Sequence, residues 1–469
     1  MENRITADNY NEFRDEIKQH NSNLLGVVLN PDEERLNQKL EQLKKDYKAG
    51  CGGAVPYDIP VLTDQNLTNS PLYRFCKAMP KGADLHVHDL ALLPLPQLID
   101  LLLCRPEFFI NTDRTALDLV RVEDGKLPPD GYIRFCDAFK CGVITYDELV
   151  NSWTLLGARQ NGMGVWEYFE ELFVKHACLS NNDDFAIAYY KKAFQYYYDS
   201  GIMHVEIHLL TCDDLDECAR YVKTVRAVYY DFKKEHPDFY LKIIGAGMKD
   251  DNDRLETTKK CFLNTVYTQE NIKDDFDKDD ICDLVIGFDL INEEDASLPL
   301  CEFAPMLLKV KKNYPSMRLF IHGGESLDAA NDNLIDAYLL GVSRVGHGLN
   351  LYRYPDLLDR YAKSEICLEV CPISNQSLGY TVDIRNHPAA EYLRRGVAIA
   401  LCSDDPTYQE NETLTDDFFA AVVGWDLNLA DLKQLAINSI TYSGLSKKQK
   451  RNLLRAYNQR WNEFVKEML

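Results

Sequence analysis

Val397-Ala398-Ile399-Ala400-Leu401-Cys402 is an apolar run that ends abruptly at Ser403-Asp404-Asp405-Pro406. Such a near-continuous apolar run is typical of a strand that is buried on both faces of a parallel sheet. Side chains directly after such a strand lie at its carboxyl end, where α/β barrels place their catalytic groups. Paired aspartates before a proline are also common as helix caps and turns. Because this pair follows a strand, we favour the functional interpretation.

Seven further apolar runs lie upstream, and helix-patterned segments separate them. These runs are Asp84–His88, His204–Leu209, Leu241–Gly245, Leu284–Leu290, Arg318–His322, Arg344–Gly346 and Cys367–Cys371. Eight strands that alternate with helices indicate a parallel sheet, and eight such units most simply close into a (β/α)8 TIM barrel. The length of 469 residues fits one large α/β barrel with additions.

Two segments stand apart from the barrel, which we assign to residues 79–469. Residues 1–78 are predicted to be an N-terminal helical extension, with Asn30 capping a helix and Pro31 at its first position. This extension is either a solvated surface helix or a dimerisation segment. The long stretch between the first two strands must hold an insertion. Its Gly- and Pro-containing part, near residues 105–140, is expected to form a small loop or hairpin.

The composition is that of a folded globular protein with a strongly acidic surface. The formal net charge is −22, which disfavours nucleic acid and anionic membranes as partners. No apolar run approaches the roughly 20 residues that a membrane-spanning helix needs. The N-terminal Met1-Glu2-Asn3-Arg4-Ile5 lacks a signal-peptide pattern, and the fourteen cysteines are scattered without a C-x-x-C pair. We therefore expect a cytoplasmic protein with free thiols.

Four of the ten histidines stand at the ends of predicted strands. His86 and His88 are two residues apart on a strand, so that both side chains point to the same face. Alone, this pair is weak evidence, because a barrel histidine is usually only hydrogen-bonded. Together with His322 and Asp404 at other strand ends, it predicts one metal site. Imidazole nitrogens with one carboxylate suit Zn²⁺, which activates water when one coordination position stays open.

Two further groups complete the predicted catalytic set. Glu325 follows His322 across two glycines, and His347 lies between two glycines, which allows the backbone to pass close to a ligand. Each has an ordinary structural alternative, a loop carboxylate or a hydrogen-bonded turn histidine. Beside a metal, they supply an acid and a base around one cavity.

These motifs together resemble the adenosine/AMP deaminase superfamily, and most of all its adenosine deaminase-related growth factor branch, the adenosine deaminase 2 type. The resemblance spans nearly the whole chain. The matching strings are Met79-Pro80-Lys81-Gly82-Ala83-Asp84-Leu85-His86-Val87-His88-Asp89, Gly287-Phe288-Asp289-Leu290, His322-Gly323-Gly324-Glu325, Val345-Gly346-His347-Gly348, Glu369-Val370-Cys371-Pro372-Ile373-Ser374-Asn375-Gln376, Asp383-Ile384-Arg385-Asn386-His387-Pro388 and Ser403-Asp404-Asp405-Pro406.

The resemblance implies a role for each matching residue. The implied zinc ligands are His86, His88, His322 and Asp404. Glu325 would donate a proton to purine N1, His347 would take a proton from the attacking water, and Asp405 would hydrogen-bond purine N7. The other implied substrate-binding positions are Asp89, Trp166, Asn292 and Gly324. In three places this chain departs from the pattern: Ile291-Asn292 replaces the usual glycine after Leu290, and residues 245–249 lack the sugar-contacting histidine. The insertion after the first strand is short and lacks the disulfide pair of that branch.

The expected function is therefore zinc-dependent hydrolytic deamination of adenosine or 2′-deoxyadenosine, with one zinc ion per chain and a homodimer built through residues 1–78. One alternative is a deaminase of AMP or of a modified adenine nucleoside. A different metal-dependent amidohydrolase is disfavoured, because residues 283–291 lack the lysine that bridges two metal ions in binuclear members. An alternative of another class is a barrel that only binds or signals. Few basic residues stand at the strand ends, with Lys249 the clearest and Lys81 behind the first strand, so a neutral nucleoside is preferred over AMP.

Overall fold

The computed structural model describes residues 9–14, 27–50, 70–113, 117–158, 163–180, 183–249 and 254–469. Its centre is an eight-stranded parallel sheet in the order β1-β5-β6-β9-β10-β11-β12-β13. The strands are β1 (Gly82–His88), β5 (Ile202–Leu210), β6 (Tyr240–Met248), β9 (Val285–Ile291), β10 (Arg318–Gly323), β11 (Arg344–His347), β12 (Cys367–Val370) and β13 (Ala398–Leu401). Each predicted strand is present to within a few residues, which confirms the predicted (β/α)8 barrel.

The barrel closes between its first strand and the residues that follow its last. Val87 and Asp404 form a parallel bridge. The amide of His88 donates to the carbonyl of Asp404, and the amide of Asp404 donates to the carbonyl of His86, both at 3.0 Å. This closure brings three predicted zinc ligands together through the backbone alone.

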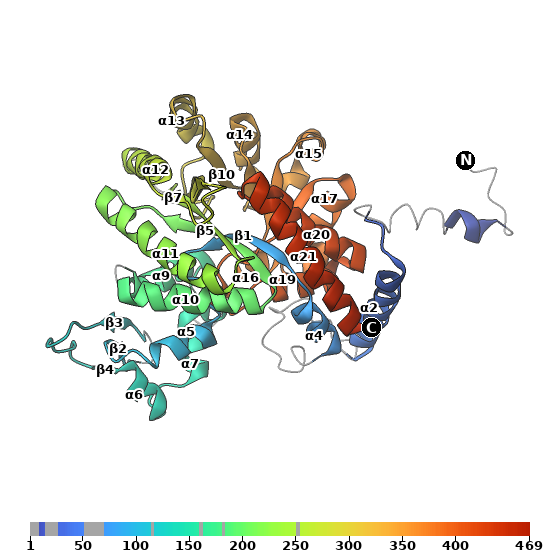
Figure 1. Ribbon diagram of the computed structural model, residues 1–469. Helices are drawn as coiled ribbons and strands as arrows, with labels where there is room; N and C mark the ends of the chain where they lie inside the picture. The colour runs from blue at the N-terminus through green and yellow to red at the C-terminus, as the bar shows by residue number, and fades with distance from the viewer. Residues whose placement is uncertain are drawn as a thin grey trace.

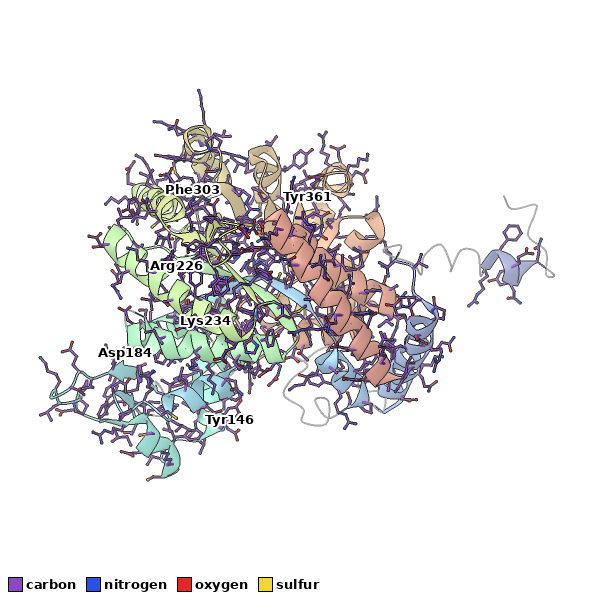
Figure 2. The ribbon with its side chains drawn as sticks, viewed as in Figure 1. Tyr146, Asp184, Arg226, Lys234, Phe303 and Tyr361 are labelled. Atoms are coloured by element: carbon purple, nitrogen blue, oxygen red, sulfur yellow. The ribbon has the colours of Figure 1, made fainter. Side chains whose placement is uncertain are left out.

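Helices alternate with the strands, and most of them surround the sheet (Figure 1). After β1 they are α5 (Leu95–Leu102), α6 (Phe135–Lys140), α7 (Tyr146–Trp153), α9 (Val165–His176), α10 (Asp183–Asp199), α11 (Leu215–Glu235), α12 (Arg254–Asn271), α13 (Leu300–Asn313), α14 (Asn333–Leu340), α15 (Pro355–Ala362), α16 (Pro372–Ser377), α17 (Ala389–Arg395), α18 (Pro406–Gln409), α19 (Leu414–Trp425), α20 (Leu429–Tyr442) and α21 (Lys447–Met468). Short 3-10 helices lie at Leu155–Gly157, Ala177–Leu179, Leu349–Arg353 and Ile384–Asn386. Buried side chains of the outer helices, among them Phe303 and Tyr361 (Figure 2), belong to the main apolar core.

The interior of the barrel contains a cluster of three charged side chains. The guanidinium of Arg344 on β11 contacts the carboxylates of Glu206 on β5 and Glu369 on β12, and all three side chains are buried. Such buried charges are tolerated because each is paired and hydrogen-bonded. The cluster links three strands across the barrel beneath the cavity described below.

The stretch expected to be a loop or hairpin contains a small separate sheet. Strands β2 (Phe108–Asn111), β3 (Leu119–Arg121) and β4 (Tyr132–Arg134) form an antiparallel sheet in the order β3-β2-β4. It projects at the lower left of Figure 1. A further two-stranded sheet pairs β7 (Lys273–Asp274) with β8 (Cys282–Asp283).

In the described part of residues 1–78, residues 10–14 are helical, and α2 (Pro31–Gly50) and α4 (Pro71–Ala78) follow before β1. The Asn30 side chain accepts from the amides of Asp32 and Glu33, so that it caps α2 as its sequence predicts. Leu36 and Leu40 are fully buried, and α2 packs against α20 and α21 of the same chain. Among the described helices, none is long and apolar enough to cross a membrane.

Candidate active site

The carboxyl ends of the strands open into a cavity of about 830 Å³. Its floor carries His88, His322, Glu325, His347 and Asp404. Aromatic side chains, including Trp166, Phe169 and Tyr408, form part of its wall. A mostly apolar cavity with a few convergent polar groups is the usual form of a small-molecule site.

The four predicted zinc ligands converge on this floor. The Nε2 atoms of His86 and His88 lie 3.4 and 3.2 Å from Oδ1 of Asp404. The ring centroids of His86 and His322 are 4.4 Å apart. Candidate ligand atoms of His86, His322, His347 and Asp404 all lie within 4.8 Å of one another, and His88 forms a second such group with Asp404 and Asp405. The two groups share Asp404, which is therefore the centre of the cluster.

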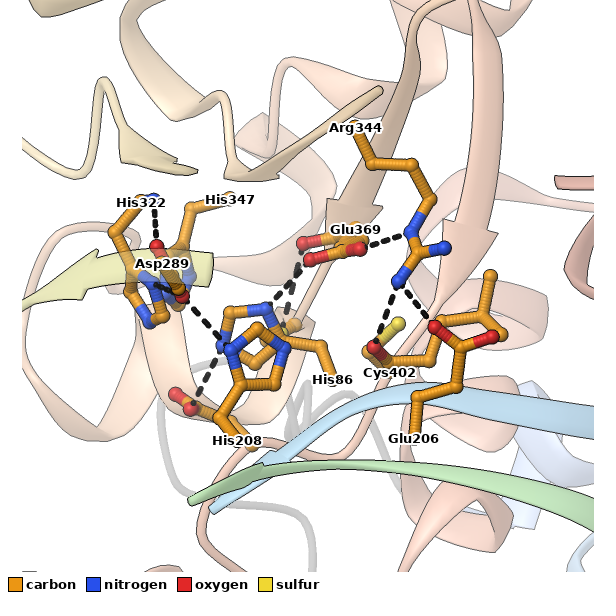
Figure 3. Close-up of polar contacts among 12 residues, drawn as sticks. His86, Glu206, His208, Asp289, His322, Arg344, His347, Glu369 and Cys402 are labelled. Carbon is orange, nitrogen blue, oxygen red and sulfur yellow. Dashed lines mark hydrogen bonds and ion pairs between the residues drawn. The ribbon is translucent and has the colours of Figure 1, made fainter. Parts of the chain in front are cut away.

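Carboxylates outside the cluster fix the orientation of two of its imidazoles (Figure 3). Nδ1 of His86 is 2.8 Å from Oε2 of Glu369, and Nδ1 of His322 is 2.7 Å from Oδ2 of Asp289. A carboxylate that accepts from one ring nitrogen leaves the other nitrogen free to bind a metal. In both histidines the free atom is Nε2.

The backbone at the strand ends is strained where the functional residues lie. Asn292, His347 and Asp404 have φ values of 101°, 63° and 59°, in the left-handed region that side chains other than glycine rarely adopt. Non-glycine residues in this region concentrate at functional sites, where the surrounding structure holds them. Here the strain turns these side chains toward the cavity.

The donor set fits a zinc ion. Nε2 of His86 is buried and has no hydrogen-bond partner, although its Nδ1 is satisfied. Buried polar atoms are normally hydrogen-bonded. A buried imidazole nitrogen without a partner, facing a carboxylate and further imidazoles, is therefore consistent with a metal ligand. Three histidines and one aspartate match the ligand types of catalytic zinc sites.

Glu325 and His347 lie side by side next to this cluster. Nδ1 of His347 is 3.3 Å from Oε1 of Glu325, and Nδ2 of Asn375 contacts both groups at 3.3 and 3.2 Å. Burial raises the pKa of Glu325 well above its usual value, and the charge of Asp404 adds to this. Burial also lowers the pKa of His347 to about 4. Glu325 is therefore set to hold a proton and His347 to accept one.

The predicted substrate-binding residues divide into two groups. Asp89, Trp166, Asn292 and Asp405 line the cavity. The carboxylate of Asp89 accepts from Tyr190 and Tyr221, and Nε1 of Trp166 donates to the hydroxyl of Tyr380 at 2.8 Å. Gly324 does not line the cavity, because its amide donates to the carboxylate of Glu294 at 3.1 Å. Gly324 differs from its predicted position at the substrate because the loop after β10 turns its amide toward the residues that follow β9.

Lys249, the expected basic residue at the mouth, is buried away from the cavity. Its ammonium group lies 3.7 Å from Oε1 of Glu294 and donates to the carbonyl of His322 at 3.3 Å. Lys81 is also buried, with its ammonium group on the carbonyls of Lys77, Met79 and Ser200. Neither lysine is available to a ligand in the cavity.

Several residues of the site went unassigned in the sequence analysis. His208 lies at the end of β5, and the rule that selected the other strand-end histidines applies to it as well. Nδ1 of His208 is 2.7 Å from Oδ2 of Asp289, the carboxylate that also holds His322. Glu294, Glu369 and Asn375 act through contacts between distant parts of the chain, for which the sequence contains no local signal.

The family model for adenosine deaminase matches residues 147–459 of the chain. The chain is 30% identical to adenosine deaminase 2-A of Danio rerio, over 94% of this chain and 91% of that protein. It is 28% identical to adenosine deaminase 2 of Dictyostelium discoideum, over 97% of this chain and 87% of that protein.

Solved structures share the fold at lower identity. An amidohydrolase from Burkholderia ambifaria with bound Zn has a TM-score of 0.59 at 18% identity, covering 85% of this chain and 94% of that one. The N6-methyl-AMP deaminase of Arabidopsis thaliana has a TM-score of 0.58 at 14% identity, covering 83% and 99%. Because the family model spans most of the barrel and the similar relatives align along nearly their whole length, the chain belongs to the adenosine deaminase family, adenosine deaminase 2 type.

Proposed function

We propose that this chain is a zinc-dependent adenosine deaminase, which converts adenosine and water to inosine and ammonia and acts on 2′-deoxyadenosine in the same way. The observation that carries the proposal is the pairing of Glu325 and His347 beside the His/Asp cluster on the floor of one cavity. The membership of the family supports it.

Four residues of the cluster would hold the metal ion. Zinc held by His86, His88, His322 and Asp404 supplies the Lewis acidity that makes water a nucleophile at neutral pH. The carboxylates of Glu369 and Asp289 hold Nδ1 of His86 and of His322, which leaves Nε2 of both rings available to bind a metal ion. The neutral imidazole of His347 accepts the proton that the attacking water loses.

The acid of the reaction is Glu325. Attack at purine C6 places negative charge on the ring unless N1 receives a proton. Glu325 is buried, which raises its pKa well above the usual value and favours the protonated carboxyl that can deliver that proton to N1. Asn375 donates to its Oε1, and Glu294 accepts the amide of Glu325, so both hold the acid in position. The exocyclic amine then leaves as ammonia.

The purine is oriented by Asp405 and by the aromatic wall. Burial and the neighbouring Asp404 raise the pKa of Asp405, which favours the protonated carboxyl that can donate to purine N7. Trp166 and Phe169 offer apolar surface for the base and sugar. Asp89 and Asn292 line the same cavity and accept or donate to hydroxyl groups of the sugar.

The cavity favours a neutral nucleoside over AMP. Among the described residues that line it there is no lysine or arginine, whereas Asp89, Glu170, Asp213, Glu217 and Asp405 are acidic. A 5′-phosphate requires arginine, lysine or free backbone amides. The net charge of −22 further slows the approach of an anion.

The test compares kcat/KM for adenosine, 2′-deoxyadenosine, AMP and N6-methyl-AMP. Deamination is monitored by the change in ultraviolet absorbance, with and without a chelator. We expect turnover of the two nucleosides that the chelator abolishes and zinc restores. No deamination of any of the four compounds by zinc-loaded protein would overturn the proposal. A kcat/KM that favours AMP would overturn the substrate preference.

We further propose that the chain forms a homodimer through the segment that precedes β1. The apolar stripe of α2 packs on its own barrel, so the interface would use the outer, charged face of α2 together with neighbouring residues. Light scattering on the full chain at micromolar concentration tests the proposal, and a monomer contradicts it.

The cytoplasm is the compartment we propose. In the described part of the chain every cysteine has a free thiol, which supports a reducing environment. Thiol titration of denatured, unreduced protein should detect nearly all fourteen cysteines as thiols. Mostly oxidised cysteines in fresh material would contradict a cytoplasmic protein.

A further inference from the structure

Three cysteines line one wall of the cavity, on the side of β5 and β6. Cys212 follows β5, Cys218 lies in the first turns of α11, and Cys261 lies on α12. None of them belongs to the zinc cluster, and the deamination mechanism uses none of them. Their position beside a substrate cavity raises the question of what these thiols do.

Two of the three sulfur atoms are in direct contact. Sγ of Cys212 lies 3.1 Å from Sγ of Cys218. Cys218 Sγ also donates to the carbonyl of Cys212 at 3.3 Å, and Cys212 Sγ donates to the carbonyl of Asp214 at 3.2 Å. These bonds keep both sulfurs in place between the loop after β5 and the start of α11. A disulfide requires two sulfurs that meet in this way without movement of distant backbone.

We propose that Cys212 and Cys218 form a reversible disulfide in the wall of the cavity, by exchange with a small neutral disulfide. Cys212 is the accessible partner, since it is half-buried and lines the cavity, whereas Cys218 is 4% exposed. Asp213 and Glu217 line the same wall, and these carboxylates disfavour anionic oxidants. The proposal therefore specifies an uncharged reagent.

The exchange proceeds in two balanced steps. The Cys212 thiolate attacks one sulfur of the small disulfide RSSR, which breaks its S–S bond and releases one RS⁻. The Cys218 thiolate then attacks Sγ of Cys212 in the mixed disulfide and releases the second RS⁻. The two protons lost by the cysteines go to the two released thiolates. The protein loses two electrons, and RSSR is reduced to two RSH.

The disulfide would affect substrate binding through α11. This effect on the substrate rests on the proposed function. The Tyr221 hydroxyl, one turn after Cys218, donates to Oδ1 of Asp89 at 3.3 Å. A disulfide shortens the distance between the sulfurs from 3.1 Å to about 2.05 Å, which draws the loop and the first turn of α11 together. A displacement of this size next to Asp89 weakens nucleoside binding, whereas Glu325 follows β10 and Asp404 follows β13, away from α11.

The experiment treats zinc-loaded, full-length protein with 2-hydroxyethyl disulfide and then measures its intact mass. We expect a loss of two hydrogen atoms that dithiothreitol reverses. Because no lysine or arginine lies between Cys212 and Cys218, a protease that cleaves before aspartate is used, and it separates them at Asp213, Asp214 and Asp216. The linked peptides should contain Cys212 and Cys218.

Matched serine variants identify the pair. Cys212→Ser and Cys218→Ser should each abolish the mass loss, whereas Cys104→Ser and Cys301→Ser, which change exposed thiols, should leave it unchanged. A linkage between any other cysteines, or only mixed disulfides on exposed thiols, would overturn the proposal. These readouts need no enzyme activity, so they stand apart from a failure of the proposed function.

Kinetics test the link to the cavity. In the oxidised protein we expect KM for adenosine to rise at least about threefold, with kcat within about twofold. The Cys212→Ser variant should show no change after the same treatment. An unchanged KM in fully oxidised protein would overturn the link between the disulfide and the cavity.

Discussion

Glu325 shows how much of a catalytic role depends on the surroundings of one side chain. The residue is buried beside His347, and its carboxyl accepts from Asn375. Replacement by glutamine preserves these contacts in size and shape but removes the acidic proton. We expect Glu325→Gln to bind zinc normally and to lose turnover by about a hundredfold or more, because an amide is not a general acid.

Metal analysis and steady-state kinetics on the same preparation check this expectation. The control is Glu302→Gln, an exposed change on α13 that should leave both quantities unaltered. Near-normal turnover in Glu325→Gln would mean that another group protonates the purine.

His88 and His347 test the assignment of ligands, since both lie near Asp404. We expect His88→Ala to lose most of its zinc, because it removes one of four ligands. We expect His347→Ala to retain zinc and to lose turnover, because it removes only the base. Zinc content per chain after gel filtration is the measurement. Loss of zinc from His347→Ala with retention by His88→Ala would reverse the two roles.

At the scale of elements, the strands of the barrel were the easiest part of the fold to predict. A strand buried on both faces requires an apolar run such as Val397–Leu401, and this signal is local. The small sheet of β2, β3 and β4 was expected only as a loop or hairpin, because its strands are three or four residues long and partly exposed. Strands of this length are too short to show the alternation of apolar and polar residues that identifies a strand in a sequence.

The residues of the site also divide into those that a local sequence pattern predicts and those that only the fold reveals. His86, His88, His322, Glu325, His347 and Asp404 could be found because each stands at the end of a predicted strand. Glu369 on β12 contacts His86 and Asn375 on α16 contacts His347, and the direction of both side chains depends on the closed barrel. Lys249 was expected at the cavity mouth for the same reason, since only the fold reveals its contact with Glu294.

Helix α2 stabilises the barrel through its apolar stripe. Leu40 is fully buried where α2 packs against α20 and α21. We expect Leu40→Ala to lower the free energy of unfolding by about 2–5 kcal/mol, through lost burial and the cavity that remains. Chemical denaturation measures the change. The exposed control Lys45→Ala should stay within about 0.5 kcal/mol of the parent. An equal effect of both changes would mean that α2 does not pack as described.

At the scale of the whole molecule, the zinc site and the closure of the barrel coincide. The ligands come from β1, from β10 and from the residue that bridges back to β1. We expect a chelator to lower Tm, because an ion that binds only the folded state stabilises it, by about 2.7 kcal/mol at a free concentration 100 times Kd. Differential scanning calorimetry is the measurement. The Asp404→Ala variant should show no further fall, and an equal fall there would place the effect of the chelator elsewhere.

The backbone bridge between Val87 and Asp404 also sets an order of events during synthesis. On the ribosome, His86 and His88 emerge early, whereas Asp404 emerges more than 300 residues later. A nascent chain that holds only the first histidines offers two of the four predicted ligands, which is an incomplete zinc site. Selective zinc loading is therefore a post-translational event. The complete ligand set exists only after the residues that follow the last strand have docked beside the first strand.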